Sequence, residues 1–319
     1  MNKSKKILLW VFKIIVFIVL IFCAYLQIEK YGVSEILLLS WNRVRVWSLL
    51  FCLLIMPINL SIEALKWRYI NKSNGEPISF SRALAAVIFG ACAGFISPGR
   101  WAEPVARAYY FGKEKRTERI YWNLTGIIAQ WLVIILAGIL SLSIYKIQGT
   151  KDTNLYLYSL VFLLLLLVFY FSHDRISQWI STFSFVQNFV KIDISNLRVS
   201  TNNKVVIFGF TGLRFCVYSF QYLVLLKAFS SESSRLEILM KVFLLFFFQS
   251  FSIFPGLLDV GLKGNIALLV FKNSLITPLD LLFVIFYIWF INLLVPSFIG
   301  YILFYRKLRD FMKTRTIVS

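Results

Sequence analysis

Runs of apolar residues constrain the fold of this chain more than any other feature of its sequence. They fall at 7–25, 46–65, 83–97, 120–145, 155–172, 205–226, 239–254 and 281–304. A helix needs about 20 apolar residues to cross the hydrocarbon core of a bilayer. Because a spanning segment must satisfy its backbone polar groups internally, these runs are expected to be helical. The sequence therefore predicts an all-α polytopic membrane protein.

The composition supports this class and limits the partners. The 319 residues are 59% hydrophobic with a mean hydropathy of +0.76, and the connections between the runs are short. We therefore expect one membrane domain over 1–319. The net charge of +19 is typical of basic cytoplasmic loops that face anionic headgroups. No soluble segment is long enough for a nucleic-acid-binding module, so no nucleic-acid partner is expected.

Two of the apolar runs are too short to cross a bilayer, and each is followed directly by Pro-Gly. These breaks are Pro98-Gly99 and Pro255-Gly256. Both flanks of the run 83–97 are strongly basic, which indicates that both lie in the cytoplasm. A full span cannot begin and end on one side, so we expect a re-entrant helical hairpin at about 83–110.

The second short run is predicted to be the mirror image of the first. The basic C-terminus is expected in the cytoplasm, and counting back from it makes 239–272 a hairpin that enters from outside. With 7–25 retained as the first span, the topology has about six full transmembrane helices, two opposed re-entrant hairpins and both termini in the cytoplasm. An interfacial helix is expected at about 175–190.

The two hairpins resemble an inverted repeat. After each Pro-Gly, an acid is followed four residues later by a base: Glu103 with Arg107, and Asp259 with Lys263. In a helix this spacing places both groups on one face. In inverted-repeat membrane folds the ends of broken helices meet near the midplane and form the substrate site.

Further polar residues occur inside the predicted spans. Those singled out are Asn59, Glu63, Lys66, Gln130, Arg214, Gln221 and Asn292. A charge at the centre of a membrane helix costs roughly 2.5–3.5 kcal/mol, so such groups usually face a cavity or a partner. Two alternatives stay open. Lys66, near a span end, is also typical of a cytoplasmic anchor, and the amides are also typical of hydrogen bonds between helices.

The basic members of this set point to a phosphate. Arginine forks bind phosphate oxygens in a bidentate manner, and helix N-termini add unpaired N–H groups. We predict that a phosphate-bearing lipid headgroup is bound by Arg100, Arg107, Arg214, Lys263 and Lys66. The acids Glu63, Glu103 and Asp259 would hold these bases in place.

Five stretches carry a resemblance to a known family. They are PGRWAEPVARAYYF (98–111), INLSIEALKWR (58–68), LRFCVYSFQY (213–222), PGLLDVGLKGNIAL (255–268) and WFINLLVPSFIG (289–300). In this order they resemble the lysylphosphatidylglycerol synthase transmembrane region family of flippase-like proteins. The resemblance implies a lipid-handling domain of a bacterial cytoplasmic (inner) membrane. Many relatives carry an acid where this chain has Gly264, and an aminoacyltransferase domain is not found here, so lipid lysylation is not expected.

Three functions are compatible with these features of the sequence. The first is translocation (flipping) of an anionic phospholipid or lipid-linked headgroup without chemistry. The second is an accessory subunit that binds a lipid, a membrane enzyme or a second copy of the chain. The third is a polyprenyl-phosphate-dependent glycosyltransferase. A separate enzyme of that kind is also a candidate partner of the chain. One histidine, cysteines confined to apolar runs and scattered acids offer no catalytic set, so no enzyme activity, metal or cofactor is expected.

Overall fold

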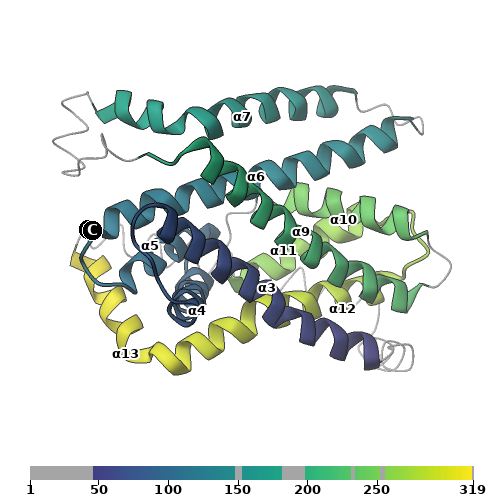
Figure 1. The fold of residues 1–319 in the computed structure, drawn as a ribbon. Coiled ribbons are helices and arrows are strands. Elements are labelled where there is room, and N and C mark those ends of the chain that lie inside the picture. The colour runs from purple at the N-terminus through teal and green to yellow at the C-terminus, as the bar shows by residue number, and fades with distance from the viewer. Residues whose placement is uncertain (1–45, 148–152, 182–197, 231–233, 252–255, 318–319) are drawn as a thin grey trace, which may run out of the picture.

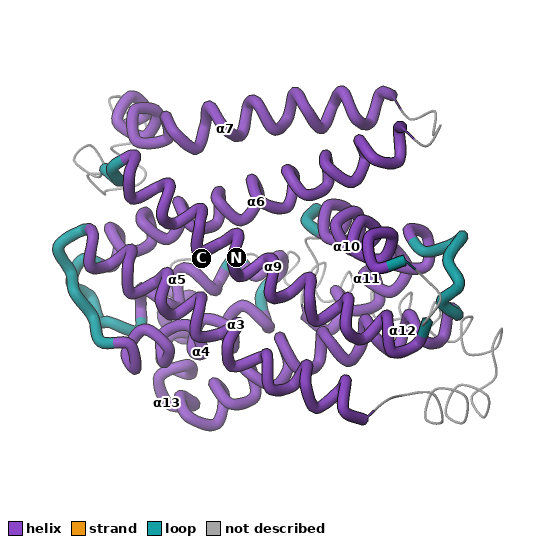
Figure 2. Tube along the Cα trace, turned by 45° about the vertical axis from the view of Figure 1, so that its right-hand side comes forward, coloured by secondary structure: helices purple, strands orange, loops and turns teal. Residues whose placement is uncertain are grey.

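Helices make up the body of the described chain. The computed structural model describes residues 46–147, 153–181, 198–230, 234–251 and 256–317, and Figure 2 shows helices throughout these ranges. The elements are α3 (Val46–Ser73), α4 (Phe80–Ile96), η1 (Pro98–Arg100), α5 (Ala102–Tyr109), α6 (Arg116–Ile147), α7 (Thr153–Ser181), α9 (Thr201–Phe229), α10 (Arg235–Gln249), α11 (Gly256–Val270), α12 (Pro278–Trp289), η2 (Phe290–Leu294) and α13 (Val295–Ile317).

Five segments are long and apolar enough to cross a membrane. They are α3, α9, most of α6 and of α7, and the continuous stretch Pro278–Lys307 that joins α12 to α13. These are five of the six full spans that the sequence predicts; the sixth, 7–25, lies outside the described residues. The prediction of an all-α polytopic membrane protein is confirmed.

The two short apolar runs form helices that end before they could span a bilayer. At 1.5 Å per residue, the 17 residues of α4 cover about 26 Å, and the 15 residues of α10 or α11 cover about 22 Å. A hydrocarbon core is about 30 Å thick. After its break each chain turns back: α5 packs on α4, and α11 packs on α10. Two broken helical hairpins are therefore present, although Pro255 itself lies outside the described residues.

The ends of the elements fall into two groups. In Figure 1 the α3–α4 and α5–α6 connections lie at the same end of the molecule as the C-terminus. The end of α9, the start of α10 and the α11–α12 connection lie at the other end. Both flanks of the first hairpin thus share a side with the C-terminus, as the charge pattern predicts. Which side faces the cytoplasm remains a prediction.

Hydroxyl side chains begin several of these helices. Ser79, Ser200 and Thr277 accept hydrogen bonds from the backbone N–H three residues later and so cap α4, α9 and α12. Such caps satisfy N–H groups that a helix leaves unpaired in its first turn. These caps fix the residues at which α4 and α12 begin, at opposite ends of the molecule.

Helix α7 lies at the edge of the molecule and packs mainly against α6 (Figure 1). It continues without a break to Ser181, so the first residues of the predicted interfacial segment 175–190 extend this helix. The remainder of that segment, 182–190, lies outside the described residues. Lys204 on α9 pairs with Asp174 at 2.7 Å, which ties the end of α7 to the start of α9.

Candidate functional site

One carboxylate, Glu63, is bonded to three basic side chains inside the helix bundle. Lys66 Nζ lies 2.8 Å from Glu63 Oε2, Arg107 Nη1 lies 2.5 Å from Oε1, and Arg214 Nη1 lies 2.7 Å from Oε2. The glutamate side chain is only 3% exposed. A charge buried this deeply is stable only when it is paired and hydrogen-bonded, as Glu63 is. Helices α3, α5 and α9 therefore meet at this residue.

A glycine lets α5 bring Arg107 into this position. A Cβ atom added at Gly90 of α4 would lie 2.6 Å from Cγ of Arg107, closer than two such atoms can approach. The stem of Arg107 thus lies directly against the backbone of α4. Small residues at such positions let membrane helices pack closely. The spacing Ala86-x-x-x-Gly90 in the sequence carries this signal, although Gly90 was not among the predicted site residues.

The break after α4 is held by a serine. Ser97 Oγ donates to the carbonyl of Gly94 at 3.2 Å and accepts from the N–H of Ala102 at 3.0 Å. It bridges the end of α4 to the start of α5. Between them, Gly99 (φ 54°) and Arg100 (φ 60°) both adopt the left-handed conformation. This conformation costs a non-glycine residue roughly 1–2 kcal/mol, so Arg100 is held in a strained position.

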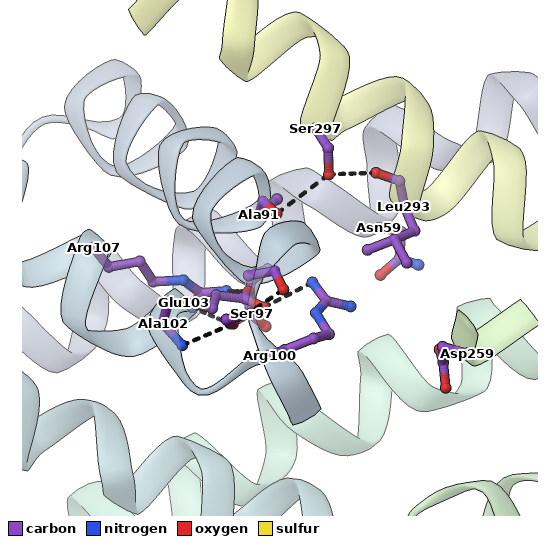
Figure 3. Close-up of polar contacts among 12 residues, drawn as sticks. Asn59, Ala91, Ser97, Arg100, Ala102, Glu103, Arg107, Asp259, Leu293 and Ser297 are labelled. Carbon is purple, nitrogen blue, oxygen red and sulfur yellow. Dashed lines mark hydrogen bonds and ion pairs between the residues drawn. The ribbon is translucent and has the colours of Figure 1, made fainter. Parts of the chain in front are cut away.

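The acid of the first hairpin joins its two arginines. Arg100 Nη2 lies 2.7 Å from Glu103 Oε2, and Arg107 donates to the other carboxylate oxygen of Glu103. Figure 3 shows Glu103 between the two guanidinium groups. Because Arg107 also binds Glu63, one continuous ionic network links the tip of the first hairpin to α3 and α9. We call Glu63, Lys66, Glu103, Arg100, Arg107 and Arg214 the Glu63 network.

A series of amides extends from the Glu63 network along α3. Arg214 Nε donates to Asn59 Oδ1 at 2.9 Å, and Asn59 donates to Asn292 Oδ1 at 3.3 Å. Asn292 then donates to Gln221 Oε1 at 3.1 Å, and Gln221 donates to the carbonyl of Cys52 at 2.9 Å. All four bonds point the same way, away from Arg214. The amide oxygens nearest the guanidinium therefore stabilise its charge and fix its position.

Asn292 reaches this series from an irregular turn. It lies in the π-helical segment η2, and Pro296 follows it by four residues. Proline has no N–H to donate to the Asn292 carbonyl, so the regular α-helical bonding cannot continue there. A π-bulge of this kind is frequent at functional sites. Next to it, Ser297 bonds to the carbonyl of Ala91 at 3.2 Å and so ties α13 to α4 (Figure 3).

The charges of the second hairpin bond to each other. Lys263 Nζ lies 2.6 Å from Asp259 Oδ2, and both residues are on α11. This helix contacts both η1 and α4. The second helix of the second hairpin, which begins at Gly256, thus packs against the first hairpin near its break.

Exposure divides the five predicted bases into two groups. The side chains of Lys66 and Arg107 are 4% and 5% exposed and bind only carboxylates. The side chains of Arg100, Arg214 and Lys263 are 38%, 27% and 21% exposed. Lys66 points inward to Glu63, not outward as an anchor would. A ligand that enters the described site can meet the second group directly.

One predicted site residue is not brought to the others. Gln130 lies on the exposed face of α6, and no described bond connects it to the Glu63 network or to the amide series. Conversely, Ser97 and the carbonyl of Cys52 belong to the site but were not predicted from the sequence. A serine directly before Pro-Gly is a signal that could have identified Ser97. The carbonyl of Cys52 has no side-chain signal in the sequence.

A further ionic cluster lies at the base of the first hairpin. Glu76, between α3 and α4, accepts from Lys115, and Arg119 Nη2 lies 3.1 Å from its other oxygen. Arg119 also donates to Asn71 at 3.2 Å. The hydrogen bond from Lys115 is the main cause that lowers the pKa of the Glu76 carboxyl. We call Glu76, Lys115, Arg119 and Asn71 the basal cluster.

Comparison with known proteins gives one match. The model of the family described as Lysylphosphatidylglycerol synthase TM region matches residues 10–300. This range includes every predicted site residue. No curated protein matches the chain.

Proposed function

This chain belongs to the lysylphosphatidylglycerol synthase TM region family, and from this membership and the site we propose that it binds the phosphate of an anionic membrane lipid and moves the headgroup across the bilayer. Membership supports a lipid-related role in a membrane. The finer proposal rests on one observation: the partly exposed bases Arg100 and Arg214 belong to one ionic network, and a third, Lys263, lies on α11, which contacts η1.

In this proposal the buried and the exposed bases do different things. Lys66 and Arg107 compensate the carboxylates Glu63 and Glu103 and so hold the scaffold together. Arg100 and Arg214 each place one end of the guanidinium on an acid. Nη2 of Arg214, whose Nε donates to Asn59, and N–H groups of Arg100 then remain to bind phosphate oxygens, which arginine does with paired bonds. Lys263 on α11 adds a point charge from the second hairpin.

Passage of the headgroup requires the hairpin tips to separate and close again. Pro98 and Gly99 interrupt the first hairpin, and Pro255 with Gly256 stands at the equivalent place in the second. Broken helices of this kind line the substrate sites of many transporters. We propose that these four residues permit the motion, while the Glu63 network keeps the first hairpin attached to α3 and α9. The protein would act in a bacterial cytoplasmic membrane, with both termini in the cytoplasm.

Lipid exchange in vesicles tests the proposal. The purified protein is placed in phosphatidylcholine vesicles that contain a fluorescent phosphatidylglycerol, and a membrane-impermeant quencher reports movement between leaflets. We expect faster exchange than in protein-free vesicles, and a loss of about tenfold or more in Arg214→Ala, because a charge-assisted hydrogen bond contributes about 1.5–3 kcal/mol. The matched control is Arg68→Ala, which removes an exposed arginine of α3.

Three results separate the alternatives. Binding of the lipid without exchange would support an accessory lipid-binding subunit. Incorporation of sugar from a polyprenyl-phosphate donor would support a glycosyltransferase. Equal exchange in Arg214→Ala and Arg68→Ala would contradict the role given to Arg214.

A further inference from the structure

The Glu63 network carries more positive than negative charge. Its ion pairs join four bases, Lys66, Arg100, Arg107 and Arg214, to only two acids, Glu63 and Glu103. Four positive charges against two negative ones leave an excess of two. The pair on α11 is neutral by itself and does not change this balance. Among the described residues, the meeting point of the two hairpins therefore has two uncompensated positive charges.

Such an excess is costly where water is scarce. Charges removed from water interact over longer distances and lose the hydration that would stabilise them. Each carboxylate of the network is already shared: Glu63 by three bases and Glu103 by two. No acid within the described network is left to balance the remaining two charges. An anion from outside is the simplest compensation.

Three donors of the Glu63 network have no described hydrogen-bond partner. Arg100 Nε and Arg107 Nε are both buried and without a partner. Arg214 uses Nε and Nη1, for Asn59 and Glu63, and no described bond involves its Nη2. A buried N–H without a partner is costly, so it is normally satisfied by a ligand or water. Arg107 is only 5% exposed, so the donors that a ligand can reach belong to Arg100 and Arg214, the two most exposed bases of the network.

We infer that the preferred ligand is a doubly charged phosphoryl group, that of a phosphomonoester lipid, and not the singly charged phosphodiester of a common phospholipid. A phosphomonoester carries about −1.5 to −2 at pH 7, because its second ionisation lies near pH 6, and it offers three acceptor oxygens. It can therefore balance both excess positive charges of the Glu63 network. A phosphodiester, with one negative charge, balances only one of them. This inference rests on the proposed function and specifies its ligand.

The charged groups that face the ligand come from every element at the hairpin tips. They are Arg100 from η1, Glu103 from α5, Arg214 from α9, and Asp259 with Lys263 from α11. Because both kinds of lipid meet these same groups, titration of the protein affects them equally. Only the phosphomonoester changes its own charge near pH 6. The ratio of the two affinities therefore isolates the charge of the ligand.

The experiment measures binding of phosphatidic acid and of phosphatidylglycerol with identical acyl chains. The full-length protein is held in phosphatidylcholine nanodiscs at low salt, and each lipid competes with a fluorescent analogue. At about pH 8 we expect phosphatidic acid to bind about tenfold more tightly, and near pH 5 the ratio should approach one. Inorganic phosphate is the third arm, and it should compete much more weakly than phosphatidic acid because it lacks acyl chains.

The variant Arg214→Gln leaves the Glu63 network with a single excess positive charge. At about pH 8 its affinities for phosphatidic acid and for phosphatidylglycerol should therefore be nearly equal. The wild-type pH profile tests the inference even if this variant does not fold. A ratio near one at every pH, with binding that still depends on Arg214, would overturn the inference and leave the proposed function intact. Inorganic phosphate that competes as well as phosphatidic acid would identify a site for soluble anions and overturn it too. If neither lipid binds, the inference and the proposed function both fail.

Discussion

The two broken hairpins share a sequence pattern but differ in their electrostatic surroundings. In the first, Glu103 and Arg107 are linked through Glu63 to α3 and α9. In the second, Asp259 and Lys263 bond to each other on a single helix. Rotating or sliding α5 would break ion pairs to other helices, whereas moving α11 keeps its pair intact. Equal spacing of charges in a sequence therefore does not imply equal bonding in the structure.

The two hairpins also differ in how their helices are attached to the rest of the protein. Helix α4 packs against both α5 and α13, and Ser297 bonds directly to its backbone. Helix α10 packs against α6, where Ser141 donates to the carbonyl of Met240 at 2.8 Å. In both hairpins the first helix is fixed to a spanning helix. In the first hairpin the second helix is also held by buried charges, through the ion pair of Arg107 with Glu63.

The largest effect is expected from Glu63→Gln, which removes the shared acid of the first hairpin. Arg107 would stay buried with only Glu103 as counter-charge, Arg214 would lose its carboxylate partner, and loss of one partner of a buried ion pair costs about 3–5 kcal/mol. We expect a lower free energy of unfolding in detergent, measured by chemical denaturation. The matched change Asp259→Asn in the second hairpin should cost less, because it breaks the pair with Lys263, whereas Glu63→Gln removes an acid shared by three bases. Equal losses would contradict the difference between the hairpins.

Gly90→Ala tests how closely the first hairpin is packed. The new methyl group would press on Cγ of Arg107 and displace it from Glu63, and such overpacking costs about 1–3 kcal/mol. A thermal shift assay should therefore show a lower melting temperature. The control is Gly209→Ala on α9, where an added Cβ meets nothing within 4 Å. That variant should be neutral or slightly stabilising, since alanine favours helix by about 1 kcal/mol.

Asn292→Ala tests whether the amide series supports Arg214. It leaves the donor of Asn59 and the acceptor of Gln221 unsatisfied, at a cost of about 1–3 kcal/mol for a buried polar group. We expect weaker lipid binding as well as lower stability. Gln130→Ala, on the exposed face of α6, should change neither. If Asn292→Ala lowers stability but leaves lipid affinity unchanged, the amides serve only to join helices.

The smallest effect is a pH dependence at the basal cluster. The pKa of Glu76 is lowered in the folded protein, so its contribution to stability is present above the unfolded pKa. That contribution is lost as the pH falls through the folded value. The protection factors of the α5–α6 connection, which are corrected for the intrinsic pH dependence of exchange, should therefore fall at acidic pH. In Glu76→Gln this fall should be absent, and no such step is expected at the second hairpin.

The sequence predicted which segments form helices better than it predicted where those helices begin, end and bend. Hydropathy and Pro-Gly placed the five described spans and both broken helices, because length and apolar content are local properties. The run 239–254 nevertheless corresponds to Arg235–Gln249, several residues earlier. The predicted span 281–304 contains a π segment at Phe290–Leu294 and a kink at Phe304. Such irregularities depend on Pro296 and on packing, which hydropathy does not describe.

The candidate site was predictable in its residue types but not in its pairing. That Glu63 would bind Lys66 follows from a spacing of three residues on one helix. That it would also bind Arg107 and Arg214 depends on how α5 and α9 are turned about their axes. Close packing at residues such as Gly90 sets these rotations. The same reasoning explains why Gln130, apparently equivalent in the sequence, lies on the outer face of α6.

The left-handed backbone of Arg100 has a consequence for engineering. A glycine at this position would adopt the same φ of 60° without steric conflict. Arg100→Gly should thus relax the joint between the two helices while it removes a guanidinium from the proposed lipid site. A screen for thermostability alone would select this change, and a screen for transport would reject it. Selection of arginine at this position would then have favoured transport over thermal stability.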